Sequence, residues 1–448
     1  MATPTAFAPL FLQSRIVPLA LLSCLLLPVQ PAVSGENWTG FQNGGQLDSG
    51  KIASAADYTK AWEVDINGYG QSSPTVWGDL IYITSVTGEK KDLLHITAHH
   101  KSDGKPVWTY ELNNATPQDN SSYVSRAAPS PVLDEQGLYV FFEGGNIAAL
   151  DHEGNLRWQK NLVEEYGPIT ARHGLASSLE QDDKTVFAWV ERMEDPYIVA
   201  LNKSSGELLW KSAGLGVASW SSPRMISVGE TKHLVLSGVG KIAGLDPATG
   251  EQLWDFEEIS GNTTPTPIPV GNDSFLVGAS VGRGQGDSGN ASKSNGVIKI
   301  SSQQDGSWKA GFVWRSKRAT CSFGSPLYAN GYCYFVNKAG VLYCLDAADG
   351  NEVYANRIGG SIWATPVAAD QQVLFPLKEG ELVFANAGAD FKITGKIETI
   401  EATEEPEDEA EQGGRGGFSG PTLYAAIVID GQILVRLGDK LISYQSGS

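Results

Sequence analysis

Cationic, imidazole and indole side chains stand in the segments that join one repeated unit of this sequence to the next. Arginine guanidinium groups form forked hydrogen bonds with carboxylate or sulfate oxygens, and indoles stack on planar rings and sugar faces. If the joining segments meet on one surface, these residue types predict a binding site for a small anionic or carbohydrate ligand. Alternatively, each arginine binds loop carbonyls or a neighbouring carboxylate, and each tryptophan fills the hole between the segments. The candidate residues are Arg126, Arg172, His173, Trp220, Lys317, Arg318, Trp363 and Arg415.

Catalytic and metal-binding chemistry has no comparable pattern. The chain has 6 histidines, but His99 and His100 fall on a predicted strand and His152 in a predicted turn, so none has metal-ligand spacing with a cysteine or carboxylate. We expect no bound metal. His173 differs because it adjoins Arg172 in a joining segment, and the alternative for it is a loop histidine bonded to the backbone.

Two cysteines predict a contact between neighbouring strands. In YCYFVNKAGVLYC, a turn centred on Lys338 and Ala339 places Cys333 opposite Cys344, close enough for a disulfide if the pair is of the non-hydrogen-bonded kind. The alternative is two buried free thiols.

A phrase that ends in an aromatic residue defines the repeated units. AHHKSDGKPVW at 98–108, ALNKSSGELLW at 200–210, GLDPATGEQLW at 244–254 and CLDAADGNEVY at 344–354 each contain a strand end, a turn with glycine and the start of a new strand. An aromatic that recurs once per sheet predicts packing between neighbouring sheets. The aromatics assigned to this structural docking are Trp62, Trp108, Trp158, Trp210, Trp254, Trp314 and Tyr354.

A second phrase, seen as SSPTVWGDLIYI from Ser72 and GSPLYANGYCYFV from Gly324, predicts a β-hairpin. The chain contains 8 such hairpins, including weaker copies from Leu175 and Thr266, and each forms a four-stranded unit with the strands after it. Repeats of about 40 to 50 residues are typical of propeller blades. Too few residues follow the last hairpin to complete its sheet, so we expect the strand at 60–66 to complete it. The prediction is an all-β, eight-bladed propeller closed by its N-terminal strand.

These phrases resemble the pyrroloquinoline-quinone (PQQ) repeat superfamily, whose signature is A-x-D-x-x-T-G-x-x-x-W. The resemblance runs from about Asn37 to the end of the chain, and the opening NWTGFQNGG is similar to secreted planctomycete proteins with these repeats. The superfamily includes quinoprotein dehydrogenases and also the non-enzymatic outer-membrane assembly lipoprotein BamB. The resemblance therefore implies a fold more specifically than a function.

Within this resemblance, a dehydrogenase requires a calcium ion with carboxylate and amide ligands, an Asp general base and, in many members, a disulfide between adjacent cysteines. The sequence has no adjacent cysteine pair, and its joining segments lack Asp or Glu where the resemblance implies them. We therefore predict a non-catalytic binding or scaffold protein at the cell envelope, similar to BamB and without a cofactor. The alternatives are a PQQ-binding quinoprotein oxidoreductase and a carbohydrate-binding or carbohydrate-active propeller.

Three segments lie outside the repeats. The apolar run IVPLALLSCLLLPV follows Arg15 and precedes the small residues PAVSG, which predicts a signal peptide over 1–34 and export to the periplasm or the extracellular space. An uncleaved anchor helix is the alternative. The propeller is expected over 35–448, with a Gly/Ser-rich loop at 282–296 and an acidic and Gly-rich loop at 398–417.

The charge of the chain limits its partners. Lys+Arg total 33 against 51 Asp+Glu, and the formal net charge of −18 repels phosphate backbones and anionic lipids. We expect no nucleic-acid partner and no transmembrane span in the mature chain. The expected partner of this monomeric propeller is an envelope protein or a small anionic or carbohydrate ligand.

Overall fold

In the computed structural model, the repeated phrases fold as antiparallel strands joined by tight turns. The phrase at 200–210 illustrates this, because β12 (Tyr197–Asn202) ends just before the turn and β13 (Leu208–Ala213) begins just after it. Asn202 Oδ1 accepts hydrogen bonds from the backbone of the turn, and Gly206 has a φ of 71°, which glycine adopts without steric cost. The recurring glycine is therefore a requirement of the turn.

The structure describes Met1 and residues 37–119, 124–171, 173–280, 291–400 and 422–447. The predicted signal peptide at 1–34, Arg172 and Arg415 lie outside the described residues. So do most of the two predicted loops, at 281–290 and 401–421. Within the predicted 282–296 loop, the described end forms the 3-10 helix η3 (Ala291–Ser294) and the start of a strand at Gly296.

The described strands form eight four-stranded antiparallel sheets. The first contains β2 (Thr75–Trp77), β3 (Leu80–Thr87), β4 (Leu93–His100) and β5 (Pro106–Asn113). The second contains β6 (Val132–Asp134), β7 (Gly137–Phe141), β8 (Asn146–Leu150) and β9 (Leu156–Asn161). The third contains β10 (Glu180–Gln181), β11 (Thr185–Val190), β12 and β13. The fourth contains β14 (Arg224–Val228), β15 (Thr231–Gly238), β16 (Lys241–Leu245) and β17 (Gln252–Phe256).

The remaining sheets follow the same order. The fifth contains β18 (Ile268–Pro269), β19 (Ser274–Val277), β20 (Gly296–Ser302) and β21 (Trp308–Arg315). The sixth contains β22 (Leu327–Ala329), β23 (Tyr332–Val336), β24 (Val341–Asp346) and β25 (Glu352–Arg357). The seventh contains β26 (Val367–Ala369), β27 (Gln372–Pro376), β28 (Glu381–Asn386) and β29 (Ile393–Glu398). The eighth contains β30 (Leu423–Ile429), β31 (Gln432–Leu437), β32 (Lys440–Ser446) and β1 (Tyr58–Asp65).

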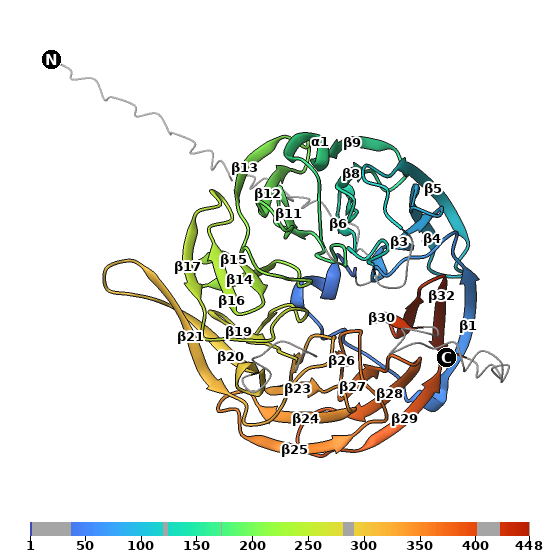
Figure 1. Ribbon diagram of the computed structural model, residues 1–448. Helices are drawn as coiled ribbons and strands as arrows, with labels where there is room; N and C mark the ends of the chain where they lie inside the picture. Colours follow the sequence, from blue (N-terminus) through green and yellow to red (C-terminus); the bar gives the residue numbers. More distant parts are fainter. Residues whose placement is uncertain (2–36, 120–123, 172, 281–290, 401–421, 448) are drawn as a thin grey trace. The chain divides into compact units, whose positions relative to one another are not determined.

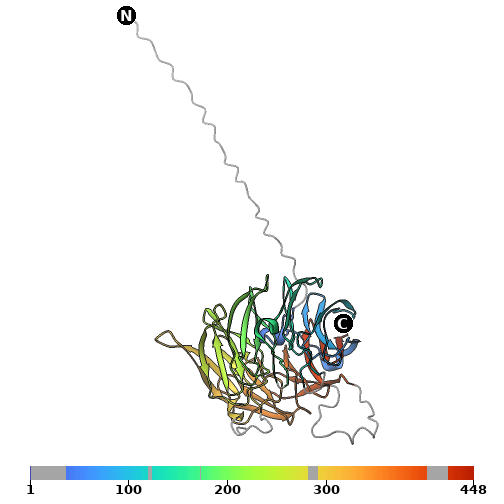
Figure 2. The same cartoon turned by 45° about the horizontal axis from the view of Figure 1, so that its top comes forward.

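Successive sheets stand side by side around a common centre, with the first strand of each sheet innermost and the last at the rim (Figures 1 and 2). The ring closes where β1 pairs with β32, from Tyr58 opposite Ser446 to Asp65 opposite Lys440. Both the eight-bladed propeller and its closure by an N-terminal strand are confirmed. Each inner strand begins after a joining segment and ends at a tight turn. We call the first of these ends the connector end and the second the hairpin end.

Each rim strand carries a β-bulge at the same place. Pairing with the neighbouring strand skips one residue, which in most sheets directly precedes the docking aromatic. A bulge increases the twist of a strand and spoils its edge as a template for a further strand. The skipped residues are Ala61, Val107, Arg157, Leu209, Leu253, Val313, Val353 and Thr394.

The aromatics of the rim strands contact the next sheet. Trp158 Nε1 donates to the Lys203 carbonyl at 2.8 Å, and a Cβ added to Gly206 would lie 2.7 Å from the Trp158 ring. Trp62, Trp108, Trp210 and Trp314 donate in the same way to the carbonyls of Lys101, His152, Pro247 and Ala347. Tyr354 instead contacts the Phe391 ring, with centroids 5.1 Å apart and an angle of 48° between the planes. Trp254 differs, because its Nε1 donates to His233 Nδ1 within its own sheet.

Helical structure is minor. The described helices are η1 (Phe41–Gly45), η2 (Ala55–Asp57), α1 (Leu162–Tyr166) and η3. None of these helices has the length and apolar character needed to cross a bilayer.

The predicted disulfide between Cys333 and Cys344 is wrong. Four residues, 337–340, lie between β23 and β24. Asn337 N donates to the Val341 carbonyl, which leaves a three-residue loop that ends at Gly340, with a φ of 70°. This shifts the register by one residue, and Cys333 lies opposite Leu345 while Cys344 lies opposite Tyr334. A one-residue shift puts the two side chains on opposite faces of the sheet. Both thiols are free and buried, and burial raises the pKa of Cys344 to about 12.

Candidate functional site

Residues 38–49, here called the central segment, cross the centre of the ring before the chain reaches β1. Trp38 pairs with Val76 of β2, Leu133 N donates to the Thr39 carbonyl at 2.8 Å, and Ser49 N donates to Ala368 O of β26 at 2.9 Å. Figure 1 shows η1, in blue, among the inner strands. Sequence analysis missed this role, because the segment has no counterpart in the repeats and carries no periodicity.

The middle of the central segment is a left-handed turn. Gln42 and Asn43 have φ values of 57° and 47°, and two glycines follow in the same region. For residues with a Cβ, this conformation costs roughly 1–2 kcal/mol each. Buried hydrogen bonds offset that cost, because Gln42 Nε2 donates to Ser325 Oγ at 2.8 Å and to Thr365 Oγ1 at 2.7 Å. Gln42 Oε1 accepts from Arg224 at 2.9 Å.

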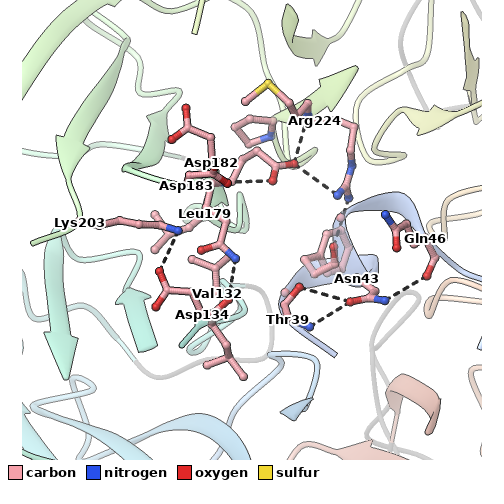
Figure 3. A pocket seen from close by; sticks show the side chains of 18 of the residues that line it. Thr39, Asn43, Gln46, Val132, Asp134, Leu179, Asp182, Asp183, Lys203 and Arg224 are labelled. Carbon is pink, nitrogen blue, oxygen red and sulfur yellow. Dashed lines mark hydrogen bonds and ion pairs between the residues drawn. The ribbon is translucent and has the colours of Figure 1, made fainter. Parts of the chain in front are cut away.

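A cavity of about 650 Å³ lies between the central segment and the inner strands β6, β10 and β14 (Figure 3). It reaches the hairpin ends of β6 and β10, where Asp134 and Asp182 begin their turns. Carboxylate, amide, ammonium and guanidinium groups dominate its wall. The lining residues include Asn43, Trp77, Asp134, Gln181, Lys203 and Arg224.

The buried charges of this cavity are paired. Lys203 Nζ lies 3.0 Å from Asp134 Oδ2, and only 4% of the Lys203 side chain is exposed. Arg224 Nη1 lies 3.4 Å from Glu180 Oε2, and burial lowers the pKa of Arg224 below its ordinary value. Because each buried cation has a carboxylate beside it, the wall is close to neutral inside and keeps many hydrogen-bonding groups.

Two polar atoms of the wall lack partners among the described residues. They are Gln181 Oε1 and Arg224 Nε, and both are buried. Gln181 Nε2 donates to the Leu133 carbonyl at 2.8 Å, which fixes the amide plane. Asn43 is engaged with its own turn, since its Oδ1 accepts from Thr39 N at 3.0 Å. Unsatisfied buried polar atoms are rare and call for an explanation.

A chain of hydroxyl groups ties the connector ends of the inner strands together. Ser73 N donates to Ser130 Oγ, Ser130 N to Ser178 Oγ, and Ser178 N to Ser222 Oγ, each at 2.9 Å. Ser222 and Thr266 continue the series toward Ser325. The serine or threonine that recurs before proline in the hairpin phrase is the sequence signal of this contact.

At the connector end, two of the predicted residues share a second pocket of about 310 Å³. The His173 and Trp220 rings lie 5.8 Å apart, and Trp220 Nε1 donates to the Gly174 carbonyl at 3.2 Å. Glu191 lines the same pocket, and its carboxylate accepts from Trp189 Nε1 and from three backbone amides at 215–217. Sequence analysis did not single out Glu191.

Arg126 and Trp363 belong to a separate group at the connector end. The Arg126 guanidinium lies 3.4 Å from the Tyr69 ring centroid, and Tyr69 shares a hydrogen bond of 2.8 Å with Tyr424. The Trp363 ring lies 6.3 Å from Tyr424 and 4.9 Å from Phe323. Arg126 therefore stacks on an aromatic ring beside aromatic neighbours from other sheets.

Arg318 lies apart from these groups. Its Nε donates to Glu352 Oε2 at 2.7 Å, on the rim strand β25, and its side chain is 61% exposed. Lys317 is exposed beside it. The structure brings His173 together with Trp220 and places Arg126 and Trp363 in one aromatic group, but it directs Arg318 to the rim. Repeat spacing locates a joining segment without fixing the direction of its side chains.

Comparison with known proteins gives one family and several structural neighbours. The family model of the outer membrane protein assembly factor BamB matches residues 48–189, 194–309 and 294–390. Quinoprotein ethanol dehydrogenase from Pseudomonas aeruginosa is 26% identical over 173 residues, which cover 35% of this chain and 26% of that protein. The chain thus spans about a quarter of the length of this curated relative.

Solved structures share the fold at low identity. BamB from Moraxella catarrhalis has a TM-score of 0.57 at 14% identity, covering 87% of this chain and 97% of its own. A europium-containing methanol dehydrogenase has a TM-score of 0.60 at 10% identity, covering 91% and 98%. Quinohemoprotein alcohol dehydrogenase from Comamonas testosteroni has a TM-score of 0.58 at 14% identity, covering 92% and 81%. These similarities concern the fold alone.

The residues of the central cavity do not fit the quinone that the repeat superfamily implies. PQQ is a tricarboxylic acid and requires available cations. The two buried cations, Lys203 and Arg224, already face Asp134 and Glu180. The wall contains five carboxylates against three cationic groups. Within the described ranges, no group of three or more His, Cys, Asp or Glu side chains is placed to hold a metal ion.

Proposed function

Because the chain belongs to the family of the outer membrane protein assembly factor BamB, we propose that it is a non-catalytic binding or scaffold protein of the cell envelope. The observation that carries this proposal is the occupied centre of the ring. The central segment is hydrogen-bonded to inner strands on several sides of the ring. The central segment therefore connects sheets on several sides of the ring.

The charges of the central cavity support the same proposal. A general base must reach a substrate proton, directly or through one water molecule. Asp134 and Glu180 instead face Lys203 and Arg224 within the wall. We further propose that residues 1–34 are a signal peptide that directs export, that the partner is an envelope protein and that the protein is monomeric in solution.

A quinoprotein oxidoreductase is the competing function. The similarity to quinoprotein ethanol dehydrogenase from Pseudomonas aeruginosa favours it. On this alternative, the quinone would have to displace the central segment or bind elsewhere on the ring.

The two functions are separated by adding PQQ and calcium to the purified protein. We expect no change in the visible spectrum and no dye-linked oxidation of alcohols or sugars, because the two buried cations of the cavity already face carboxylates. A dehydrogenase of known activity, treated in the same way, serves as the positive control. Quinone-dependent turnover would replace the proposed function with the enzymatic one.

A further inference from the structure

The second pocket, at the connector end of the third and fourth sheets, carries a further inference, which rests on the binding function proposed above. His173 and Trp220 reach it from the joining segments before β10 and β14, and Glu191 and Met193 reach it from the loop after β11. Its volume of about 310 Å³ is at the lower end of the range of natural small-molecule sites. The pocket therefore has room for a small molecule or a small head group.

Glu191 gives this pocket a negative charge. Its Oε2 accepts from Trp189 Nε1 at 2.8 Å and from Leu215 N at 3.0 Å, and its Oε1 accepts from the backbone amides of 216 and 217 at 2.7 and 3.2 Å. Four donors directed at both oxygens favour the ionised form, because a protonated acid would place its own hydrogen against one of them. These donors carry no net charge, so they leave the charge of the carboxylate uncancelled.

Within the described residues, no cation forms an ion pair with Glu191. Two buried glutamates, Glu143 and Glu180, each lie 3.4 Å from a lysine or arginine nitrogen. Arg192 lines the same pocket as Glu191, but its Nε donates to the Asp195 carbonyl at 3.1 Å and its Nη2 lies 3.4 Å from Asp195 Oδ2. The remaining charge of the pocket attracts a cation, and the net charge of −18 on the whole chain acts in the same direction.

Aromatic and thioether groups complete the wall. The Trp220 and His173 rings lie 5.8 Å apart with an angle of 52° between their planes, and the Trp220 indole is fixed by its hydrogen bond to the Gly174 carbonyl. The face of an aromatic ring attracts a cation, and an indole does so most strongly. Met193 is 78% exposed, and its flexible apolar side chain can pack against methyl groups.

The hydrogen bonds of Glu191 select the kind of cation. An ionised carboxylate has about four acceptor sites, and N–H donors of the protein already use four. A primary ammonium would lose hydrogen bonds to water on entering the pocket without gaining an acceptor on Glu191. A quaternary ammonium has no N–H group, so it brings the same charge without this loss.

We propose that the second pocket binds a quaternary ammonium group through Glu191, Trp220 and His173. The carboxylate supplies the opposite charge, and the two rings and Met193 contact the methyl groups. Free choline and the head group of phosphatidylcholine both carry this group, and both sources fit the chemistry of the pocket.

The test titrates the purified full chain by calorimetry with tetramethylammonium, choline and ethanolamine, and with the carbon analogue of choline, in which a neutral tert-butyl group replaces the trimethylammonium group. We expect tetramethylammonium and choline to bind, and ethanolamine and the carbon analogue to bind at least about tenfold more weakly. Sedimentation with phosphatidylcholine vesicles separates the two sources. A protein that sediments with the vesicles takes the lipid head group, and one that binds choline but stays in solution takes the free solute.

Four variants test the residues. Glu191→Gln removes the charge and Trp220→Ala removes the indole, and each should weaken the binding of tetramethylammonium by about tenfold or more. Trp220→Phe keeps an aromatic ring and should retain part of the affinity. Glu194→Gln is the matched control, because it removes the same charge from an exposed residue of the same loop that does not line the pocket, and it should leave binding unchanged.

Near-ultraviolet circular dichroism shows whether each variant is folded, and the Trp220 variants test the site even if Glu191→Gln does not fold. Three results would each overturn the proposal: ethanolamine or the carbon analogue binding as tightly as choline, unchanged affinity in the folded Glu191 and Trp220→Ala variants, or no binding of either quaternary ammonium at millimolar concentration. Any of these without PQQ-dependent oxidation rejects only this ligand class, while PQQ-dependent oxidation rejects the proposed function itself.

Discussion

At the scale of single residues, five indoles of the rim strands each join one sheet to the next through a hydrogen bond and a ring contact. Trp210 Nε1 donates to the Pro247 carbonyl at 2.9 Å, and its ring packs against Gly250. We predict that Trp210→Ala lowers the free energy of unfolding by about 3–5 kcal/mol, because it leaves a cavity between two sheets. Urea denaturation followed by tryptophan fluorescence measures the change.

Leu209→Ala is the control for this prediction. Leu209 is the neighbouring bulge residue and is 50% exposed, so its truncation should change the free energy of unfolding by less than about 0.5 kcal/mol. Equal effects of the two substitutions would contradict the docking role of Trp210.

Glu191 is a half-buried carboxylate, and its hydrogen-bond donors are one indole and three backbone amides. Burial raises the pKa of Glu191 above its ordinary value, although its four donated hydrogen bonds oppose the shift. An acid with a raised pKa in the folded state contributes stability below the unfolded pKa, about 4.3, and loses it as pH rises through the folded pKa. We therefore predict that the free energy of unfolding contains a term that falls as pH rises above about 4.3.

Glu191→Gln tests this prediction. The amide nitrogen of Gln cannot accept two of the four hydrogen bonds. We therefore expect the free energy of unfolding to fall by about 1–3 kcal/mol at neutral pH, and the pH-dependent term to disappear. Urea denaturation of both proteins between pH 4 and 7 measures it. If both proteins show the same pH dependence, another group is responsible.

At the scale of elements, β1 closes the ring on its own. We predict that a chain beginning at Asn67, which lacks β1, has a lower Tm and self-associates, because the outer edge of β32 is then unpaired. A chain beginning at Ala55 keeps β1 but lacks the central segment, and it should remain monomeric. Light scattering after size-exclusion chromatography distinguishes the two, and equal self-association would contradict the closing role of β1.

Hairpins and their number follow from the repeats, because turn residues and alternating apolar positions determine both. The pairing register between neighbouring strands is harder to predict from the repeats. The three-residue loop that ends at Gly340 and the two-residue turn expected at Lys338 and Ala339 differ by one residue, yet this difference moves Cys333 and Cys344 to opposite faces. The local sequence does not determine which of the two turns forms, because both would use nearly the same residues.

At the scale of the whole molecule, the ring was predictable because every sheet repeats the same signals. The central cavity was not predictable, because it depends on the central segment, which has no repeat and which meets its partners only in the folded ring. The candidate residues from the joining segments that the structure describes show the same limit. Their sequence positions place Arg126 and Arg318 in equivalent segments, but one stacks on Tyr69 and the other reaches Glu352 at the rim.

The pairing of β1 with β32 also bears on how the protein is made. Tyr58 meets Ser446, so nearly the whole chain must be synthesised before its first strand finds a partner. Contacts between such distant residues form slowly, because a very large loop must close first. During that interval the newly made chain has two unprotected strand edges, and a holding chaperone would be most useful to it then.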